Sequence, residues 1–402
     1  MKNLTAVILA GGKGSRLGLL TKNTPKPLLK INNKKFLDYL LFDVSRYGFK
    51  KIIIVAGYKG FKFNKYHNQN ILNSKIEVFV EKKTNGTLGA LDKIKNKIKG
   101  DFFIFNGDTF FNFNFLDLLN VSKENKYKKI FISLREIICK DLNRYNSYKF
   151  IKKSLKLTKK KLNEKILISG GIIFCKNSIL KQLDKVGDFE NYINHQKKFE
   201  NKITGKIFNN PFIDIGLPKD FNSSGKFLKK NMPKKAIFFD RDGVLNAIKD
   251  NQYIINKHQF KWTSGAKKTI KFFNDNNYFV FIITNQAGIG KGLIKIQDYF
   301  EIEKKIQEDL HQIGAHIDKI YFCPYHVEAK IKKYRKKSFY RKPNPGMILK
   351  SFREFPVLKK NSFFIGDNLS DKSAAEKAGI KFFMFKKKNL YNFINIKFNK
   401  KY

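Results

Sequence analysis

Short apolar runs recur along the chain and alternate with longer, mixed polar stretches. Such runs are Leu4 to Ala10, Lys51 to Ala56 and Phe102 to Phe105 in the first half, and Tyr278 to Ile283 in the second. The stretch Gln297 to Gly314 has instead the length and polarity of a helix. Parallel strands buried on both faces read as continuous apolar runs and are joined by helices. The pattern therefore predicts an α/β fold with parallel sheets.

The chain length of 402 residues suits two or three domains of ordinary size. The segment 225–235 is basic, carries one proline and shows no strong apolar period. We therefore expect one domain over residues 1–225, a linker over 226–235 and a second domain over 236–402. No apolar run approaches the roughly 18 residues of a membrane span, so no membrane insertion is expected. The first apolar run follows the N-terminus directly, so no signal peptide is expected.

Two carboxylates follow the apolar run Ala236 to Phe239. Asp240 and Asp242 are two positions apart on an extended segment, so both side chains point the same way. Like charges that close are hard to keep ionised without a cation or a shared proton. The pair suits a carboxylate nucleophile beside a carboxylic acid, with magnesium to share. Taken alone, it is equally compatible with an ordinary Asp-Gly turn.

Further polar segments follow apolar runs downstream. They are Thr284-Asn285-Gln286, Arg341-Lys342-Pro343, and Gly366-Asp367-Asn368 with Asp371. In this order the segments match the signature motifs of the haloacid-dehalogenase phosphatase superfamily. The local sequences resemble those of the D-glycero-D-manno-heptose 1,7-bisphosphate phosphatases and, more distantly, the histidinol-phosphate phosphatases. The segments that carry this resemblance are DRDGVLN, TNQAGIGKG, RKPNPGM and GDNLSD. The resemblance covers about residues 234–385.

This resemblance implies a haloacid-dehalogenase-like Rossmannoid sheet with a minimal cap and its site at the carboxyl ends of the strands. Asp240 would attack phosphorus and form an aspartyl-phosphate, and Asp242 would serve as acid and then as base. Magnesium would be held by Asp240, Asp367 and the main-chain carbonyl of Asp242. The remaining implied roles are phosphoryl binding by Thr284 and Lys342, and substrate binding by Arg341, Asn285 and Asn368.

A glycine-rich loop follows the first apolar run of the chain. Gly11, Gly12 and Gly14 allow backbone N–H groups to approach an anion closely, and Lys13 and Arg16 add charge. The spacing is that of neither a P-loop nor a dinucleotide-binding loop. Downstream are the stiff segment Thr24-Pro25-Lys26-Pro27-Leu28, a strand that ends in Asn106-Gly107-Asp108, and Phe212-Ile213-Asp214-Ile215-Gly216.

This set resembles the sugar-1-phosphate nucleotidyltransferases over about residues 4–221, which implies a Rossmann-like domain with a mixed sheet. The loop from Gly11 to Arg16 would wrap the nucleoside triphosphate. Lys26 would steady the phosphates while Asp108 and Asp214 hold magnesium. Further implied positions are Glu81 and Gly86 to Gly89 near base and sugar, and the Gly170-Gly171 turn at the sugar. Arg144-Tyr145 is left out of the expected site because Asn146 stands where many members have glycine.

The net charge is +49, from 82 lysines and arginines against 33 acids. A basic patch can bind nucleic acid or anionic lipid. Here the lysines are scattered and accompany abundant Asn, Ile, Phe and Tyr, as an AT-rich coding sequence favours. We therefore expect no nucleic-acid function, and we expect the basic segment 386–402 to be a terminal helix or frayed tail.

The cysteines Cys139, Cys175 and Cys323 are odd in number and far apart. They indicate no disulfide framework and agree with a reducing, cytoplasmic location. The resembling heptose phosphatases commonly hold a structural zinc through Cys-x-His and Cys-x-Cys pairs. This chain has His326 displaced by one position, and Ser338 and Tyr340 stand where sulfur ligands are expected. Since structural zinc needs four ligands, no zinc is expected.

The two resemblances together predict a bifunctional enzyme. Removing the 7-phosphate from heptose 1,7-bisphosphate leaves a sugar 1-phosphate, which is the substrate class of the first domain. GTP is the favoured nucleotide by resemblance, whereas the base, the anomer and the oligomeric state do not follow from the residues. Two alternatives stay open: a histidinol-phosphate phosphatase fused to another sugar nucleotidyltransferase, and a basic phosphatase that processes polynucleotide ends.

Overall fold

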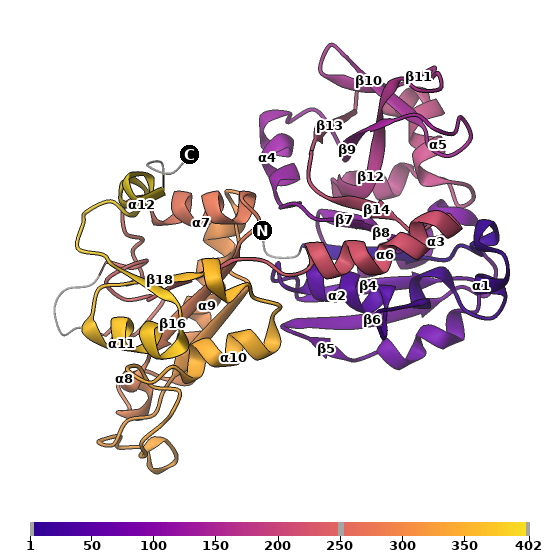
Figure 1. The fold of residues 1–402 in the computed structure, drawn as a ribbon. Helices are drawn as coiled ribbons and strands as arrows, with labels where there is room; N and C mark the ends of the chain where they lie inside the picture. Colours follow the sequence, from indigo (N-terminus) through magenta and orange to yellow (C-terminus); the bar gives the residue numbers. More distant parts are fainter. Residues whose placement is uncertain (1–3, 248–252, 399–402) are drawn as a thin grey trace. The chain divides into compact units, whose positions relative to one another are not determined.

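The computed structural model describes residues 4–247 and 253–398, and the chain divides into two compact units, Met1–Asn231 and Met232–Tyr402 (Figure 1). The segment 226–235, expected as a linker, is helical as far as Asn231. It continues helix α6 (Pro218–Asn231), whose buried Ser224 and Leu228 lie one turn apart on the same face. This buried face, together with a hydrogen bond of 2.9 Å from Asn112 Nδ2 to the Asn231 carbonyl, keeps the segment folded against the first unit.

The main sheet of the first unit has the strand order β11-β10-β12-β7-β1-β4-β6-β5, and β9 pairs with both β12 and β13. Strands β1, β4, β6 and β7 are parallel, whereas β12 runs antiparallel to β7 and β9. The expected mixed sheet is confirmed. The strand bounds are β1 Thr5–Ala10, β4 Lys51–Ala56, β5 Asn70–Ile71, β6 Ser74–Val80, β7 Phe102–Asn106, β9 Ile130–Ile138, β10 Ser147–Ile151, β11 Ser154–Thr158, β12 Lys165–Cys175 and β13 Ile203–Ile207.

Helices and two small sheets complete this unit. The helices are α1 Leu19–Lys22, α2 Phe36–Ser45, α3 Gly86–Ile94, α4 Asp117–Glu124, α5 Phe189–His195 and α6. The small sheets are β2 Lys30–Ile31 with β3 Lys34–Lys35, and β8 Thr109–Phe111 with β14 Phe212–Asp214.

Residues of β1 alternate between two hydrophobic cores, one on each face of the sheet. Ala6 and Ile8 belong to one core, whereas Val7 belongs to the other. On β4, Ile54 belongs to the first of these cores and Val55 to the second. Because both faces are covered, these strands need apolar residues at every position, which explains the continuous runs in the sequence.

The second unit is built on a parallel sheet with the order β17-β16-β15-β18-β19. This agrees with the expected Rossmannoid fold. The strand bounds are β15 Ala236–Phe239, β16 Phe279–Asn285, β17 Lys319–Cys323, β18 Phe363–Gly366 and β19 Lys381–Met384. The helix bounds are α7 Ala266–Asp275, α8 Ala287–Gly290, α9 Ile296–His311, α10 Gly346–Glu354, α11 Leu369–Ala378 and α12 Leu390–Phe398. Part of the predicted basic tail is thus helix α12, and residues 399–402 lie outside the described residues.

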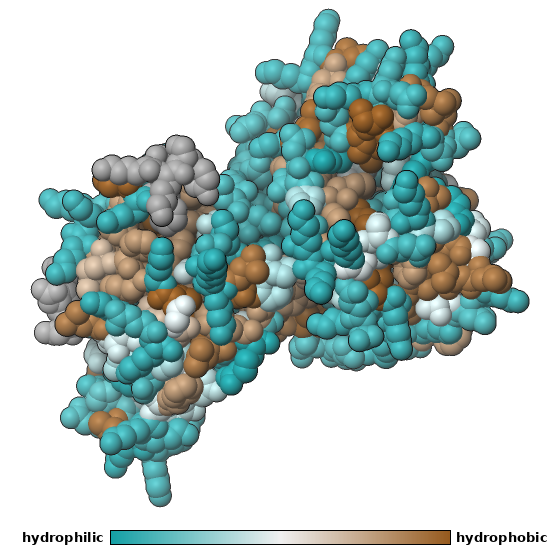
Figure 2. Space-filling view, viewed as in Figure 1, coloured by the Kyte–Doolittle hydropathy of each residue, from teal (hydrophilic) through white to brown (hydrophobic). Residues whose placement is uncertain are grey.

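Hydrophilic side chains cover much of the face drawn in Figure 2, on both units, and apolar residues are scattered between them. Among the described residues, no helix is both long and apolar enough to cross a membrane.

Candidate active sites in the two units

A cavity of about 880 Å³ opens at the carboxyl ends of β1 and β7 in the first unit. The glycine loop from Gly11 to Arg16 follows β1, and Asp108 follows β7. Since β1 and β7 are hydrogen-bonded parallel neighbours, the turns after them meet at one edge of the sheet. Two motifs nearly a hundred residues apart in the sequence therefore line one cavity.

The glycine loop presents unused backbone donors. Within the described part of the chain, the N–H groups of Gly12, Lys13 and Gly14 donate no hydrogen bond. Gly14 has a φ of 70° and begins a 3-10 turn, and a Cβ there would contact Thr21 and Lys26. Its conformation and surroundings thus both require glycine. Free N–H groups beside exposed Lys13 suit the phosphates of a nucleotide.

Three predicted residues meet at the far side of this cavity. Lys26 Nζ lies 2.6 Å from Asp108 Oδ2. The strand carrying Asp214 pairs with the strand that starts at Thr109, so the two carboxylates face the same cavity. Burial and the negative charge of Asp108 raise the pKa of Asp214. A carboxylate whose ionisation a neighbouring acid disfavours is suited to share a cation with that neighbour.

The structure adds a pair that sequence reasoning left out. Tyr145 Oη donates to Asp214 Oδ2 at 3.0 Å, and Arg144 reaches the main-chain oxygen of Asp214 at 3.3 Å. Arg144 also pairs with Asp220 at 2.6 Å. The cavity is lined by Arg144, Tyr145 and Asn146. Asn146 stands where many members of the family have glycine, but the segment still lines the cavity. The Arg-Tyr motif was therefore a valid signal for Arg144 and Tyr145.

A polar cluster lies at the other end of the cavity, beside Gly171. Glu190 accepts hydrogen bonds from Ser169 Oγ at 2.8 Å and Tyr148 Oη at 3.0 Å. Burial raises the pKa of Glu190. Gly170 and Gly171 do not form the expected turn but lie inside β12, where the pairing with β9 is irregular between Ser169 and Ile173. A Cβ on Gly170 would collide with Phe111 at 2.5 Å, so packing requires glycine at this position. Sequence reasoning missed Glu190, which no motif singled out.

Gly89 does not line the cavity, although it was expected in the site. It lies inside α3, where a Cβ would meet the Lys185 carbonyl oxygen at 3.0 Å and the Asn85 side chain at 2.5 Å. Its neighbours Gly86, Thr87 and Ala90 line the cavity instead. Gly89 is therefore a packing residue of this helix.

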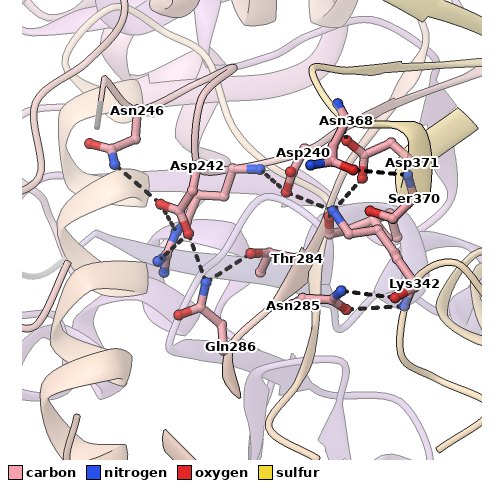
Figure 3. Close-up of polar contacts among 12 residues, drawn as sticks. Asp240, Asp242, Asn246, Thr284, Asn285, Gln286, Lys342, Asn368, Ser370 and Asp371 are labelled. Atoms are coloured by element: carbon pink, nitrogen blue, oxygen red, sulfur yellow. Dashed lines mark hydrogen bonds and ion pairs between the residues drawn. The ribbon is translucent and has the colours of Figure 1, made fainter. Parts of the chain in front are cut away.

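In the second unit, Lys342 joins Asp240, which follows β15, to Asp371 in the first turn of α11 (Figure 3). Its Nζ lies 2.9 Å from Asp240 Oδ1 and 2.6 Å from Asp371 Oδ1, and it donates to the Ile283 carbonyl at 3.1 Å. Burial, opposed by Lys342 and reinforced by Asp371, raises the pKa of Asp240 to about 7. The carboxylates of Asp240, Asp367 and Asp371 have oxygens within 4.8 Å of one another.

Asp242 points away from this cluster (Figure 3). Arg241 donates two hydrogen bonds of 3.0 and 2.8 Å to the Asp242 carboxylate. Gln286 and Asn246 donate to the same carboxylate at 2.9 and 3.2 Å. Burial would raise the pKa of Asp242, but the Arg241 charge and these donors outweigh it and lower the pKa. Gln286 also donates to Thr284 Oγ1 at 2.8 Å. Arg241 is a buried guanidinium that no sequence motif marked as a site residue.

Two expected substrate-binding residues are engaged with the protein. Both ends of the Asn285 amide pair with the main chain of Lys342 at 3.1 Å, so Asn285 positions that lysine. Asn368 caps α11, where its Oδ1 accepts a main-chain N–H at 3.0 Å. Arg341 is half-buried and donates to the Tyr325 carbonyl at 3.4 Å. Arg341 is the charged residue of the three, and it lies in the loop that follows β17.

Cys323 and His326 belong to no group of three or more potential metal ligands among the described residues, and the absence of zinc stays a prediction. Cys323 is buried, and burial raises the pKa of its thiol. His326 Nδ1 accepts a hydrogen bond from the Glu328 N–H at 3.1 Å. Across the loop, Arg335 Nε donates to the Ala329 carbonyl at 2.7 Å. Among the described residues, the acid cluster around Asp240 is the group of three or more potential ligands.

The acids at both sites have the chemistry of a magnesium site. Asp240, Asp367 and Asp371 supply clustered carboxylate oxygens, and Asp108 and Asp214 supply two more in the other unit. Hard cations prefer such oxygen ligands. Asp367 was expected in this set and Asp371 was not, whereas the main-chain carbonyl of Asp242 stays a predicted ligand.

Comparison with known families matches each half separately. Residues 5–165 match the nucleotidyl transferase family model, and residues 235–400 match the model described as polynucleotide kinase 3 phosphatase. A crystal structure of HddC from Yersinia pseudotuberculosis is 26% identical, with 55% of this chain and 98% of that chain covered at a TM-score of 0.47.

Curated relatives are more specific. A D-glycero-alpha-D-manno-heptose 1-phosphate guanylyltransferase of Campylobacter jejuni is 32% identical over 223 residues, which cover 54% of this chain and 97% of the relative. A D-glycero-beta-D-manno-heptose-1,7-bisphosphate 7-phosphatase of Rhodopseudomonas palustris is 38% identical over 161 residues, covering 40% of this chain and 88% of the relative. An alpha-anomer 7-phosphatase of C. jejuni is 40% identical over 149 residues, covering 37% and 80%. The chain therefore belongs to the heptose 1-phosphate guanylyltransferase family in its first half and to the heptose-1,7-bisphosphate 7-phosphatase family in its second.

Proposed function

We propose that this chain catalyses two consecutive steps toward a nucleotide-activated heptose. The second unit would remove the 7-phosphate of D-glycero-D-manno-heptose 1,7-bisphosphate, and the first would join the resulting heptose 1-phosphate to GMP from GTP, releasing pyrophosphate. The observation that carries this proposal is that one chain is similar to both a heptose-1,7-bisphosphate 7-phosphatase and a heptose 1-phosphate guanylyltransferase, since the product of the first reaction is the substrate of the second. The guanylyltransferase relative is named for the alpha anomer, and this similarity favours the alpha anomer as the substrate of this chain.

In the phosphatase step, an oxygen of Asp240 attacks the phosphorus, and the bond to the sugar oxygen breaks. Lys342, 2.9 Å from Asp240, offsets charge on the phosphoryl group. Asp242 delivers the proton to the sugar oxygen and later takes one from the water that hydrolyses the aspartyl-phosphate. Because Arg241 holds Asp242 ionised, its side chain must turn from Arg241 and take up a proton before it acts as an acid.

In the transfer step, a sugar-1-phosphate oxygen attacks the α-phosphorus of GTP in line, without a covalent enzyme intermediate. The free N–H groups after Gly11 and the Lys26 ammonium support the leaving pyrophosphate. We further propose magnesium at Asp108 and Asp214, and at Asp240, Asp367 and Asp371. When bound, the ion would spread negative charge on the phosphoryl oxygens.

A second candidate for the C-terminal unit is a polynucleotide end phosphatase. The description of the matching family model and the net charge of +49 favour it. Such an enzyme would bind DNA or RNA with a strong salt dependence. The relatives that are 38% and 40% identical carry heptose phosphatase names, and we therefore rank the sugar bisphosphate first.

The test supplies heptose 1,7-bisphosphate, magnesium and each of the four nucleoside triphosphates to the full chain, with products identified by mass spectrometry. We expect phosphate, pyrophosphate and GDP-heptose. Histidinol phosphate and a 3′-phosphorylated oligonucleotide are tested in parallel. Faster phosphate release from either of these would contradict the assignment of the second unit.

A further inference from the structure

Three buried polar atoms of the second unit, all on residues near Asp242, have no hydrogen-bond partner among the described residues. They are Arg241 Nη1, Tyr299 Oη and Glu303 Oε1. The first is a donor, the last is an acceptor, and the hydroxyl can do both. Leaving a buried polar group unpaired is costly, and such groups are rare in folded proteins. Three complementary groups left unpaired together therefore indicate that they pair in another state of the site.

The Arg241 guanidinium contacts Asp242 with one edge and also approaches helix α9. Its Nε and Nη2 donate to the Asp242 carboxylate at 3.0 and 2.8 Å. Its Cζ lies 5.7 Å from the centre of the Tyr299 ring, which is fully buried. Because the guanidinium is a rigid plane and Asp242 occupies the edge formed by Nε and Nη2, Nη1 is directed away from that carboxylate. This nitrogen is therefore the part of Arg241 that is free to bind a second acceptor.

Glu303 is a carboxylate that α9 places near Arg241. Tyr299 and Glu303 are four residues apart on α9, so their side chains lie on the same face of the helix. Burial raises the pKa of Glu303 to about 7, opposed by Tyr299 and by the Arg241 charge, which are the titratable groups that act on it. The carboxyl is therefore partly ionised near neutral pH, and a closer approach of the guanidinium would favour the ionised form.

The phosphatase step needs such a second acceptor. Asp242 has to turn from Arg241 before it can protonate the sugar oxygen. A buried guanidinium that loses its carboxylate is strongly destabilised, because its charge is then both desolvated and unpaired. Arg241 is 1% exposed, so solvent cannot replace the lost partner. An anionic acceptor at Nη1 would offset this cost and allow Asp242 to leave.

We propose that Glu303 is a positioning residue of the phosphatase, which accepts a hydrogen bond from Arg241 Nη1 when Asp242 turns toward the sugar oxygen. Tyr299 Oη then donates to the Glu303 carboxylate. This inference rests on the proposed phosphatase function and deepens it. Glu303 does not touch the substrate and acts through Arg241. Its effect is therefore confined to the step in which Asp242 delivers a proton, and it is small where the leaving group departs without one.

The test compares heptose 1,7-bisphosphate with p-nitrophenyl phosphate, whose phenolate leaves without a proton. Single-turnover experiments with the full chain and magnesium follow release of heptose 1-phosphate or p-nitrophenol, which precedes hydrolysis of the aspartyl-phosphate. Since a general acid contributes about 100-fold or more, Glu303→Gln should slow the sugar substrate by about 10- to 100-fold, because a neutral amide cannot balance the Arg241 charge. The rate with p-nitrophenyl phosphate should stay within about threefold of wild type. Tyr299→Phe should have a smaller effect with the same dependence on the leaving group.

The matched control is Glu301→Gln, the same substitution at a partly exposed glutamate of α9 that pairs with Lys304 at 3.3 Å and with Lys257 at 3.4 Å. It should keep both wild-type rates. Urea unfolding shows whether each variant is folded, and Tyr299→Phe carries the comparison if Glu303→Gln is not.

Two results would overturn the inference. Unchanged rates in Glu303→Gln would mean that Arg241 needs no second acceptor. An equal loss with both substrates in a folded variant would make Glu303 a structural partner of Arg241 only. If the wild type releases no phosphate from heptose 1,7-bisphosphate, the proposed function fails, and the inference fails with it.

Discussion

Lys342 is expected to be as important for the stability of the second unit as for its chemistry. Its side chain is 3% exposed and contacts two carboxylates, of which Asp371 is fully buried and Asp240 nearly so. Lys342→Met keeps the aliphatic stem but leaves these carboxylates without their cation. Removing one partner of a buried ion pair costs about 3–5 kcal/mol, because the remaining charge stays buried. We expect a loss of this size in the free energy of unfolding.

The chain provides a convenient probe of this loss. Trp262 is the single tryptophan and lies in the second unit, so its fluorescence reports the unfolding of that unit. With a urea m-value of about 2 kcal/mol/M, the midpoint should fall by about 1.5–2.5 M. The matched control is Lys319→Met, because Lys319 is 25% exposed and pairs with Glu354 at 2.8 Å. That pair should contribute about 1 kcal/mol or less. All samples contain a metal chelator.

The dependence on pH distinguishes unpaired charge from simple loss of packing. Burial already raises the pKa of Asp240 to about 7, and removing the ammonium raises it further. A carboxyl with a raised folded-state pKa stabilises the protein fully below its unfolded pKa and loses that contribution as pH rises through the folded value. The gap between Lys342→Met and wild type should therefore narrow from about pH 8 to about pH 5.5. A gap below about 1 kcal/mol at pH 8, or one independent of pH, would refute this reasoning. Adding Asp371→Asn should recover part of the stability at pH 8, whereas phosphatase activity should stay absent throughout.

The other expectations concern the two reactions. Asp240→Asn should abolish phosphate release while nucleotidyl transfer from supplied heptose 1-phosphate persists; parallel loss of both activities in a folded variant would show that the units are not independent. Asp108→Ala or Asp214→Ala should stop metal-dependent pyrophosphate release and spare the phosphatase, and full transferase activity in both variants would mean that the metal site is misplaced. Purified protein should contain no stoichiometric zinc by elemental analysis, since Ser338 and Tyr340 stand where sulfur ligands are expected; one zinc per chain would contradict this. Asp240→Asn given bisphosphate and GTP should form almost no nucleotide sugar, because a 7-phosphate adds about two negative charges at the sugar end; conversion at the wild-type rate would disprove the order of steps.

Local sequence patterns indicated both families and several of the residues that the structure brings together in the two candidate sites. The apolar runs at β1, β7, β15 and β18 are continuous because both faces of these strands are covered, so they could be recognised without any partner. The polar residues just after them are placed by the same logic, since the carboxyl ends of parallel strands share one edge of a sheet. This is why Asp108 and Asp240 could be predicted as site residues.

The tertiary structure decided which side chains meet. Lys342 and Asp240 come from distant parts of the chain, and their pairing with Asp371 depends on how α11 begins, which no local pattern encodes. The orientation of Asp242 depends in the same way on competition between the metal cluster and the buried guanidinium of Arg241. Electrostatic energies fall with distance and rise with burial, and both quantities exist only once the chain is packed. The sequence therefore identifies the groups that can react, and packing decides the charge and direction of each.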